Sequence, residues 1–188
     1  MSKRRRVVDM KNEVTEVDRL KACQLLEKNV SVVEHFFAED DWHCRKEVRD
    51  EVVIFRGGVA GFSGMYSDYA FLLVVGSYDI QCYATFPANL KDAVTKVAEL
   101  IARINYQIKY GGFELNCDNG ELRFHICVPA VAVRHDSFAL MRFLMLTPVQ
   151  MLDRYAKVIT AVLVGSDLPK SVLDSFESTR TKEVADGK

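Results

Sequence analysis

The chain has few of the features that mark a membrane protein or a disulfide-rich secreted protein. Its five cysteines are odd in number and include no Cys-x-x-Cys pair, which favours reduced thiols and a cytoplasmic location. The formal net charge is −1 at pH 7, so no overall field attracts nucleic acid or anionic lipid. Apolar runs such as residues 70–75 are too short to cross a bilayer. We therefore expect no membrane partner.

Catalytic and cofactor-binding patterns are also missing. No Gly-x-Ser-x-Gly elbow occurs, and the glycines at 57–61 lack the Lys-Ser/Thr of a phosphate-binding loop. His125 and Cys127 would share one strand face near Glu114, but the paired ligand spacing of a zinc site is absent. We predict that the protein is not an enzyme and has no cofactor or metal. The alternative is a small-molecule or metal-sensing domain that uses these three residues.

Residues 1–14 begin with four basic residues in the first six positions. The apolar run that a signal peptide needs does not follow them. Four bases without aromatic neighbours neutralise few phosphates. We interpret this segment as a basic flexible tail, and a nucleic-acid partner is not expected.

The chain of 188 residues is 49% apolar and 27% charged, which is the composition of one ordinary globular domain. We assign that domain to residues 15–165. From residue 166 the chain is polar, and Leu168, Val172 and Phe176 give only a weak amphipathic pattern. Residues 166–188 are therefore interpreted as a polar C-terminal tail, either disordered or loosely docked.

Helix and strand signals follow one another along the first half of the domain. Thr15 and Asp18 predict the start of a helix over residues 16–38, because apolar residues then recur every three or four positions. Residues 39–51 are polar and predict a loop. Three strands are predicted at 52–55, 69–75 and 78–86. Short connections between them predict an antiparallel meander.

The second half begins with a helix whose apolar stripe runs over residues 90–108, with Asn89 as its cap. A hairpin with Asn119-Gly120 as a two-residue turn is predicted next. Its register pairs Cys117 with Leu122, Leu115 with Phe124 and Phe113 with Ile126 on one face, and Asn116 with Arg123 and Glu114 with His125 on the other.

Two helices are predicted to complete the domain, at 137–146 and 147–165. The second starts at Thr147, with Pro148 at the first helical position, and ends at Gly165. The predicted order is thus α-βββ-α-ββ-α. It indicates an α+β domain in which an antiparallel five-stranded sheet has helices packed mainly on one face.

Residues 97–128 resemble the YbjN family of bacterial sensory transduction regulators. The motifs are Ile104-Asn105 late in a helix, Gly111-Gly112-Phe113-Glu114, and Gly120-Glu121-Leu122-Arg123-Phe124. The resemblance implies a fold similar to the type III secretion chaperones, which dimerise and bind extended segments of partner proteins. The motif residues look structural rather than chemical: Asn105, Gly112, Phe113, Glu114, Gly120 and Arg123.

Apolar and aromatic residues suggest where a partner would bind. In the segment 138–146 only Arg142 is charged, and a helix that is apolar all round is buried or awaits a partner. The candidate partner-binding or dimer residues are Phe138, Met141, Met145, Met151 and, on the sheet, Tyr83. For the helix residues, core filling, a dimer seam and a client-peptide groove all remain open. For Tyr83, a half-buried position beside a loop agrees with the sequence as well as a position in an interface does.

These observations predict a non-catalytic, chaperone-like regulatory module that binds an unidentified protein partner. A homodimer is expected. A small-molecule or metal-sensing domain is the alternative function.

Overall fold

The computed structural model describes residues 15–135, 137–165 and 167–185, so the predicted tail at 1–14 lies outside the described residues. The helices are α1 (Glu16–Glu39), the 3-10 turn η1 (Lys91–Ala93), α2 (Val94–Asn105), α3 (Ala130–His135), α4 (Ser137–Val164) and α5 (Pro169–Ala185). The strands are β1 (Arg45–Val48), β2 (Val53–Ala60), β3 (Asp68–Val75), β4 (Asp79–Thr85), β5 (Gly112–Leu115) and β6 (Leu122–Pro129). They form an antiparallel sheet in the order β1-β2-β3-β4-β6-β5. The α+β class and the antiparallel sheet are therefore confirmed.

The sheet has six strands, so the predicted number of five is wrong. The additional strand, β1, lies within the segment 39–51 that the sequence indicated as a loop. It pairs with β2, with Arg45 opposite Arg56 and Val48 opposite Val53. Three of its four residues are charged, and charged side chains are typical of edge strands. Such a strand shows no apolar alternation in the sequence, because backbone pairing with β2, rather than burial of its side chains, holds it in the sheet.

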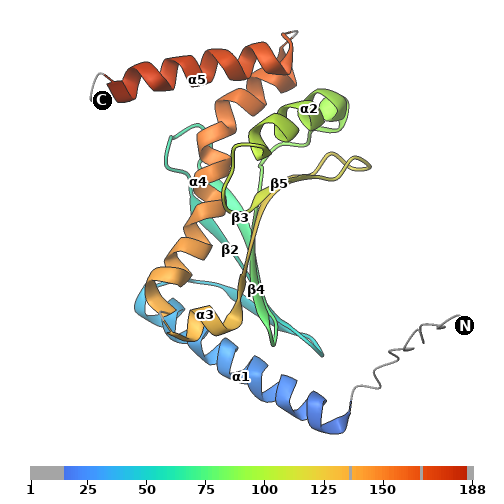
Figure 1. Cartoon of the computed structure of the whole chain (residues 1–188), viewed down its shortest axis with the longest axis vertical. Coiled ribbons are helices and arrows are strands. Elements are labelled where there is room, and N and C mark those ends of the chain that lie inside the picture. The colour runs from blue at the N-terminus through green and yellow to red at the C-terminus, as the bar shows by residue number, and fades with distance from the viewer. Residues whose placement is uncertain (1–14, 136, 166, 186–188) are drawn as a thin grey trace, which may run out of the picture.

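The hydrophobic core lies on one face of the sheet (Figure 1), where α4 runs along the strands. Toward α1, the core combines Val33 and Phe36 with Leu73 of β3. Toward α2 and α5, it combines Leu100 of α2 with Phe124 of β6. The strand residues of both core regions alternate along each strand, so the helices cover a single face.

Helix α1 begins as the sequence predicts. The Asp18 backbone N–H donates to the Thr15 hydroxyl at 3.2 Å, and the Asp18 carboxylate accepts from Thr15 in return, which satisfies the free donors of the first turn. Farther along, the buried Asn29 side chain donates to the carbonyl oxygens of Gly76 and Ser77 at 2.8 and 3.0 Å. This amide therefore joins α1 to the turn between β3 and β4.

Helix α4 is continuous from Ser137 to Val164, so the predicted division into two helices at Thr147 is wrong. Pro148 lies inside α4, where proline removes one backbone hydrogen bond. Leu144 and Met145 before it, and Val149 and Leu152 after it, are all fully buried. Because one buried face runs through the proline, tertiary packing outweighs the local stop signal. No helix in the described ranges is long and apolar enough to span a bilayer.

The β5–β6 hairpin keeps the predicted faces but shifts the register by two residues. Phe113 lies opposite Phe124 and Leu115 opposite Leu122, so a six-residue connection replaces the predicted two-residue turn. The Asn116 side chain accepts from the backbone N–H groups of Asp118 and Asn119 at 3.0 and 3.3 Å. This local turn ends β5 at Leu115. A shift by two leaves each side chain on its original face.

Most of the segment predicted as a C-terminal tail forms helix α5. Leu173 is buried in the core region shared with α2, and the ring of Phe176 lies 5.8 Å from that of Tyr155 on α4. Figure 1 shows α5 crossing the end of α4 beside α2. The weak amphipathic pattern therefore corresponds to a docked helix.

Candidate functional site

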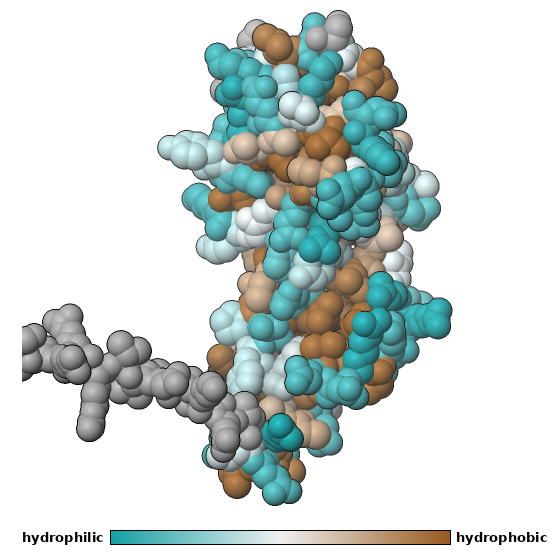
Figure 2. Space-filling view, turned by 90° about the vertical axis from the view of Figure 1, so that its right-hand side faces the viewer, coloured by the Kyte–Doolittle hydropathy of each residue, from teal (hydrophilic) through white to brown (hydrophobic). Residues whose placement is uncertain are grey.

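The face of the sheet opposite the core has no described helix along β4 and β6 (Figure 1). We call it the open face. Strand alternation places on it the residues that belong to neither core region. Arg56, Gly58 and Ala70 are exposed there, and Leu72 and Val74 are half-buried. Figure 2 shows apolar side chains reaching the surface between polar ones in both halves of the molecule.

The register orders the open face into rows across the strands. One row contains Arg45, Arg56, Leu72, Tyr83, His125 and Gly112. The next contains Glu47, Ile54, Val74, Gln81 and Cys127. Apolar residues of β2 and β3 thus lie between a basic margin at β1 and a polar cluster at β4, β6 and β5.

The polar cluster is built on Glu114. Its Oε2 accepts from Arg123 Nε at 2.7 Å, and its Oε1 lies 3.0 Å from His125 Nδ1. Arg123 lies directly opposite Glu114 in the sheet, so the two charges form a cross-strand pair. The side chains of Glu114 and Arg123 are 43% and 38% exposed, which limits the contribution of the pair to stability.

Tyr83 lies on this face, as its alternation in the strand predicts. Its ring stacks on His125 with centroids 4.3 Å apart, and the Arg123 guanidinium carbon lies 4.4 Å from the ring centroid. Its hydroxyl donates to Gln81 Oε1 at 2.6 Å. Burial raises the pKa of Tyr83, while the charge of Arg123 opposes the rise. At neutral pH the phenol is therefore a hydrogen-bond donor rather than an anion.

The residues of the metal-sensing alternative are only partly brought together. His125 contacts Glu114, and Cys127 is exposed on the same face. Within the described residues, no group of three or more His, Cys, Asp or Glu side chains is arranged to hold a metal ion. Burial and the nearby Asp79 raise the pKa of Cys127, which reduces the thiolate that a metal would need.

The family-motif residues hold the hairpin in place. The Asn105 side chain accepts from the Phe113 N–H at 2.9 Å and donates to the Phe113 carbonyl at 3.0 Å, which fastens β5 to the end of α2. Gly112 lies against this amide, and Phe113 is buried. The backbone of Gly120 packs against that of Lys91. Except for Gly112, Glu114 and Arg123, these motif residues lie away from the open face.

The candidate residues on α4 divide into buried and accessible ones. Met141 and Met145 are fully buried in the core, and Met151 is half-buried against it. Phe138 remains 39% exposed, and its ring lies 5.4 Å from that of Phe36. Of these four side chains, Phe138 presents the most apolar surface to a partner.

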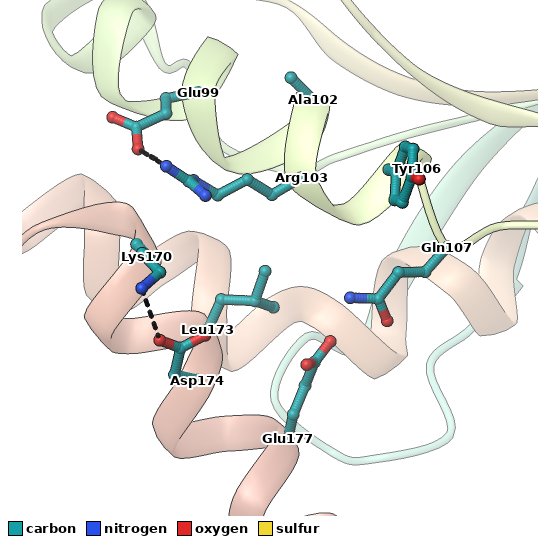
Figure 3. Close-up of a pocket in the computed structure, with 9 residues that line it drawn as sticks. All are labelled: Glu99, Ala102, Arg103, Tyr106, Gln107, Lys170, Leu173, Asp174 and Glu177. Carbon is teal, nitrogen blue, oxygen red and sulfur yellow. Dashed lines mark hydrogen bonds and ion pairs between the residues drawn. The ribbon is translucent and has the colours of Figure 1, made fainter.

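A groove of about 510 Å³ lies between α2 and α5 (Figure 3). Arg103 pairs with Glu99 on α2 at 2.8 Å, and Lys170 pairs with Asp174 on α5 at 3.7 Å. Leu173 lies between the two helices. The groove is thus mixed in charge, with each cation paired on its own helix. No sequence pattern indicates this groove, because the weak apolar pattern of residues 166–188 predicts a tail rather than a helix beside α2.

The sequence also missed the apolar part of the open face. The nearly continuous apolar run of β3 indicated a central strand, which the sheet order confirms, but it did not indicate that Leu72 and Val74 are half-buried on the open face. Their alternation with the fully buried Leu73 and Val75 is invisible when every residue is apolar. The sequence also does not indicate the basic margin at β1, because it predicts a loop where β1 lies.

Comparison with known proteins does not place the chain in a family. A scan of the chain against protein-family models finds no match, and a search of curated proteins finds no significant match. The function is therefore inferred from the open face, from α4 and from the groove.

Proposed function

We propose that this protein is a non-catalytic, chaperone-like regulatory module that binds a protein partner through the open face and acts as a homodimer. Its five unpaired cysteines suit a reducing compartment such as the cytoplasm. The observation that carries the proposal is an antiparallel sheet covered by helices on one face only, with Leu72 and Val74 accessible on the other.

The order of the elements supports a type III secretion chaperone-like fold. Without the edge strand β1, the chain runs α-βββ-α-ββ up to β6 and then continues into helices. This is the order that the resemblance to the YbjN family implies. Proteins of such a fold bind extended segments, and a sheet face with apolar and polar rows suits that mode of binding.

The proposed dimer uses the accessible aromatic residues of α4. Phe138 and Phe143 are each 39% exposed, and Phe143 packs edge-on against the 65%-exposed Tyr110. Aromatic residues are enriched in interfaces because they bury large areas at low entropic cost. Light scattering of the full chain should give a dimer mass, and Phe143→Glu should shift it toward the monomer. A monomer mass for the unaltered chain would contradict the dimer.

Partner binding is tested with variants of the open face. The tagged full chain and a Leu72→Glu/Val74→Glu variant are used to capture proteins from the source cell, followed by quantitative mass spectrometry. Val164→Glu is the matched control, because Val164 is 78% exposed on α4. We expect a partner that the control retains and the open-face variant loses. Equal capture by all three chains would reject the open face as the binding surface.

A small-molecule-sensing domain is the second candidate, and the groove between α2 and α5 favours it. The groove lies within the volume range of small-molecule sites. A metabolite screen by thermal shift should then find a ligand that raises the Tm of the unaltered chain but not of Arg103→Ala. The absence of any such ligand, with partner binding intact, would leave the protein-binding function alone.

A further inference from the structure

We propose that the margin of the open face at β1 and β2 binds an acidic segment of the partner protein, in which carboxylates adjoin apolar side chains. This inference rests on the proposed function and specifies the chemistry of the partner. It is argued from three arginines, from the carboxylate that two of them share, and from the apolar residues beside them.

The margin brings two arginines together. Arg45 and Arg56 lie directly opposite each other on β1 and β2, with both side chains on the open face. Like charges in this position destabilise a sheet unless an anion lies between them. Among the described residues no hydrogen bond or ion pair reaches the exposed Arg45 side chain. Its guanidinium is therefore available to a partner.

The carboxylate on β1 is already shared. Glu47 Oε1 accepts from Arg49 Nε and Nη2 at 2.9 and 2.8 Å, and Glu47 Oε2 lies 3.7 Å from Arg56 Nε. The Arg49 hydrogen bond, together with the charges of Arg49 and Arg56, lowers the pKa of Glu47. On the open face of the two strands, Arg45 and Arg56 therefore meet one negative charge, that of Glu47. Asp50 and Glu51 follow in the β1–β2 turn, and residues 45–56 together carry a net charge of +1, although the whole chain carries −1.

Apolar surface begins at the next strand. Leu72 lies opposite Arg56 in the same row, and Val74 follows in the next row beside the buried Ile54 of β2. Arg45 and Leu72 are two strand spacings apart, which is roughly 10 Å, and an extended chain rises about 3.3 Å per residue. A segment crossing the strands would thus place a carboxylate over the arginines and an apolar side chain about three residues farther along.

A protein segment fits this surface better than a nucleic acid does. Three arginines neutralise few phosphates, and base binding on a sheet needs aromatic rings with a free face. On the open face the Tyr83 ring is occupied by His125 and Arg123. The half-buried Leu72 and Val74 instead offer contacts to aliphatic side chains.

The test uses the full chain and a fluorescein-labelled synthetic peptide in which pairs of glutamates are followed by pairs of leucines. Binding is measured by fluorescence anisotropy. A second peptide carries lysine in place of every glutamate, and a single-stranded oligonucleotide serves as a competing anionic probe. The charge variant is Arg45→Glu, and its matched control is Lys157→Glu on the exposed surface of α4. The apolar variant is Leu72→Gln, with Val164→Gln as its control.

We expect the glutamate peptide to bind more tightly than the lysine peptide, with an affinity that falls as salt is added. Arg45→Glu should weaken this binding by about tenfold or more, and Leu72→Gln should weaken it as well. Lys157→Glu and Val164→Gln should leave it within about twofold of the unaltered chain.

Three results would overturn the proposal. The first is equal affinity for the two peptides, and the second is an unchanged affinity of Arg45→Glu for the glutamate peptide. The third is an oligonucleotide that binds more tightly than the glutamate peptide and loses this binding in Arg45→Glu. If Arg45→Glu has no effect while Leu72→Glu/Val74→Glu still loses the captured partner, the acidic chemistry fails and the proposed protein-binding function stands.

Discussion

The carboxylate of Asp153 on α4 accepts a hydrogen bond of 3.1 Å from the hydroxyl of Tyr69 on β3. The same carboxylate accepts from the Ser63 backbone N–H at 2.6 Å and from the Ser63 hydroxyl at 3.0 Å. Asp153 is 7% exposed, so it is a buried acid whose three donors come from β3 and the β2–β3 connection. These bonds attach that connection to α4.

Asp153→Asn is expected to lower the free energy of unfolding by about 2 kcal/mol. The amide has the same size as the carboxylate. Its NH₂ group cannot accept a hydrogen bond, however, and would face one of the three groups that now donate to the carboxylate. Urea unfolding measures the change. Asp167→Asn, at an exposed position after α4, should change stability by less than about 0.5 kcal/mol. Equal stability of the two variants would show that the buried carboxylate has no structural role.

Three glycines give a graded test of the hairpin and the loops. Gly120 has φ of +76°, and an added Cβ would overlap the backbone of Lys91, whereas Gly64 has φ of +73° with open space around it. Gly58 has neither constraint. Substitution by alanine should therefore cost more than about 2 kcal/mol at Gly120, about 1 kcal/mol at Gly64 and least at Gly58. Thermal unfolding of the three variants checks this order, and a mild effect at Gly120 would contradict the hairpin geometry.

Helix α5 is expected to contribute to the stability of the domain. Leu173 is 4% exposed and Leu168 is 70% exposed. Leu173→Ala should cost about 2 to 3 kcal/mol, because it leaves a cavity between α5 and α2, whereas Leu168→Ala should cost less than about 0.5 kcal/mol. If both variants unfold at the same urea concentration as the unaltered chain, the segment behaves as a tail.

Stability is expected to fall in alkaline solution. Burial raises the pKa of the Cys44 thiol from 9.0 to about 11 and raises the pKa of Cys82 farther. Burial, with the Asp153 hydrogen bond, also raises the pKa of Tyr69 above 10.0. Above about pH 9 the unfolded chain releases protons that the folded chain retains, so the free energy of unfolding decreases with pH. Below pH 9 these groups keep their protons in both states, and their stabilising effect is complete.

Cys82→Ala isolates one part of this dependence. The variant should be less stable at pH 7, because Cys82 is fully buried against Met145. It should also lose less of its stability between pH 9 and pH 10 than the unaltered chain does. Urea unfolding under reducing conditions at pH 7, 9 and 10 measures both effects, with the exposed Cys23→Ala as control. An identical slope in Cys82→Ala would show that this thiol does not titrate with unfolding.

Much of the fold follows from local sequence patterns. The cap at Thr15 and Asp18 predicted the start of α1, and the apolar stripe after Asn89 predicted a helix where α2 lies. Alternation in β4 placed Tyr83 on the face opposite Cys82, where the structure has it. These features depend on the 3.6- and 2-residue periods of helix and strand, so a single segment is enough to reveal them.

The candidate site could be predicted only in pieces. The sequence placed His125, Cys127 and Tyr83 on outward faces and placed Glu114 opposite His125. The structure instead pairs Glu114 with Arg123 across the strands and leaves His125 in side-chain contact with Glu114. The two-residue shift of register depends on the turn that Asn116 forms with its neighbours. The alternation of the strands is the same in both registers and does not distinguish them.

The sequence by itself determined the element types over most of the chain, the α+β class and the faces of β4 and β6. Tertiary structure alone decided that β1 joins the sheet, that α4 continues through Pro148, and that Met141 and Met145 are buried in the core. It also decided that Leu72 and Val74 lie on an open face. The reason is physical: local periods show which residues share a side, but burial depends on which distant segment packs against that side.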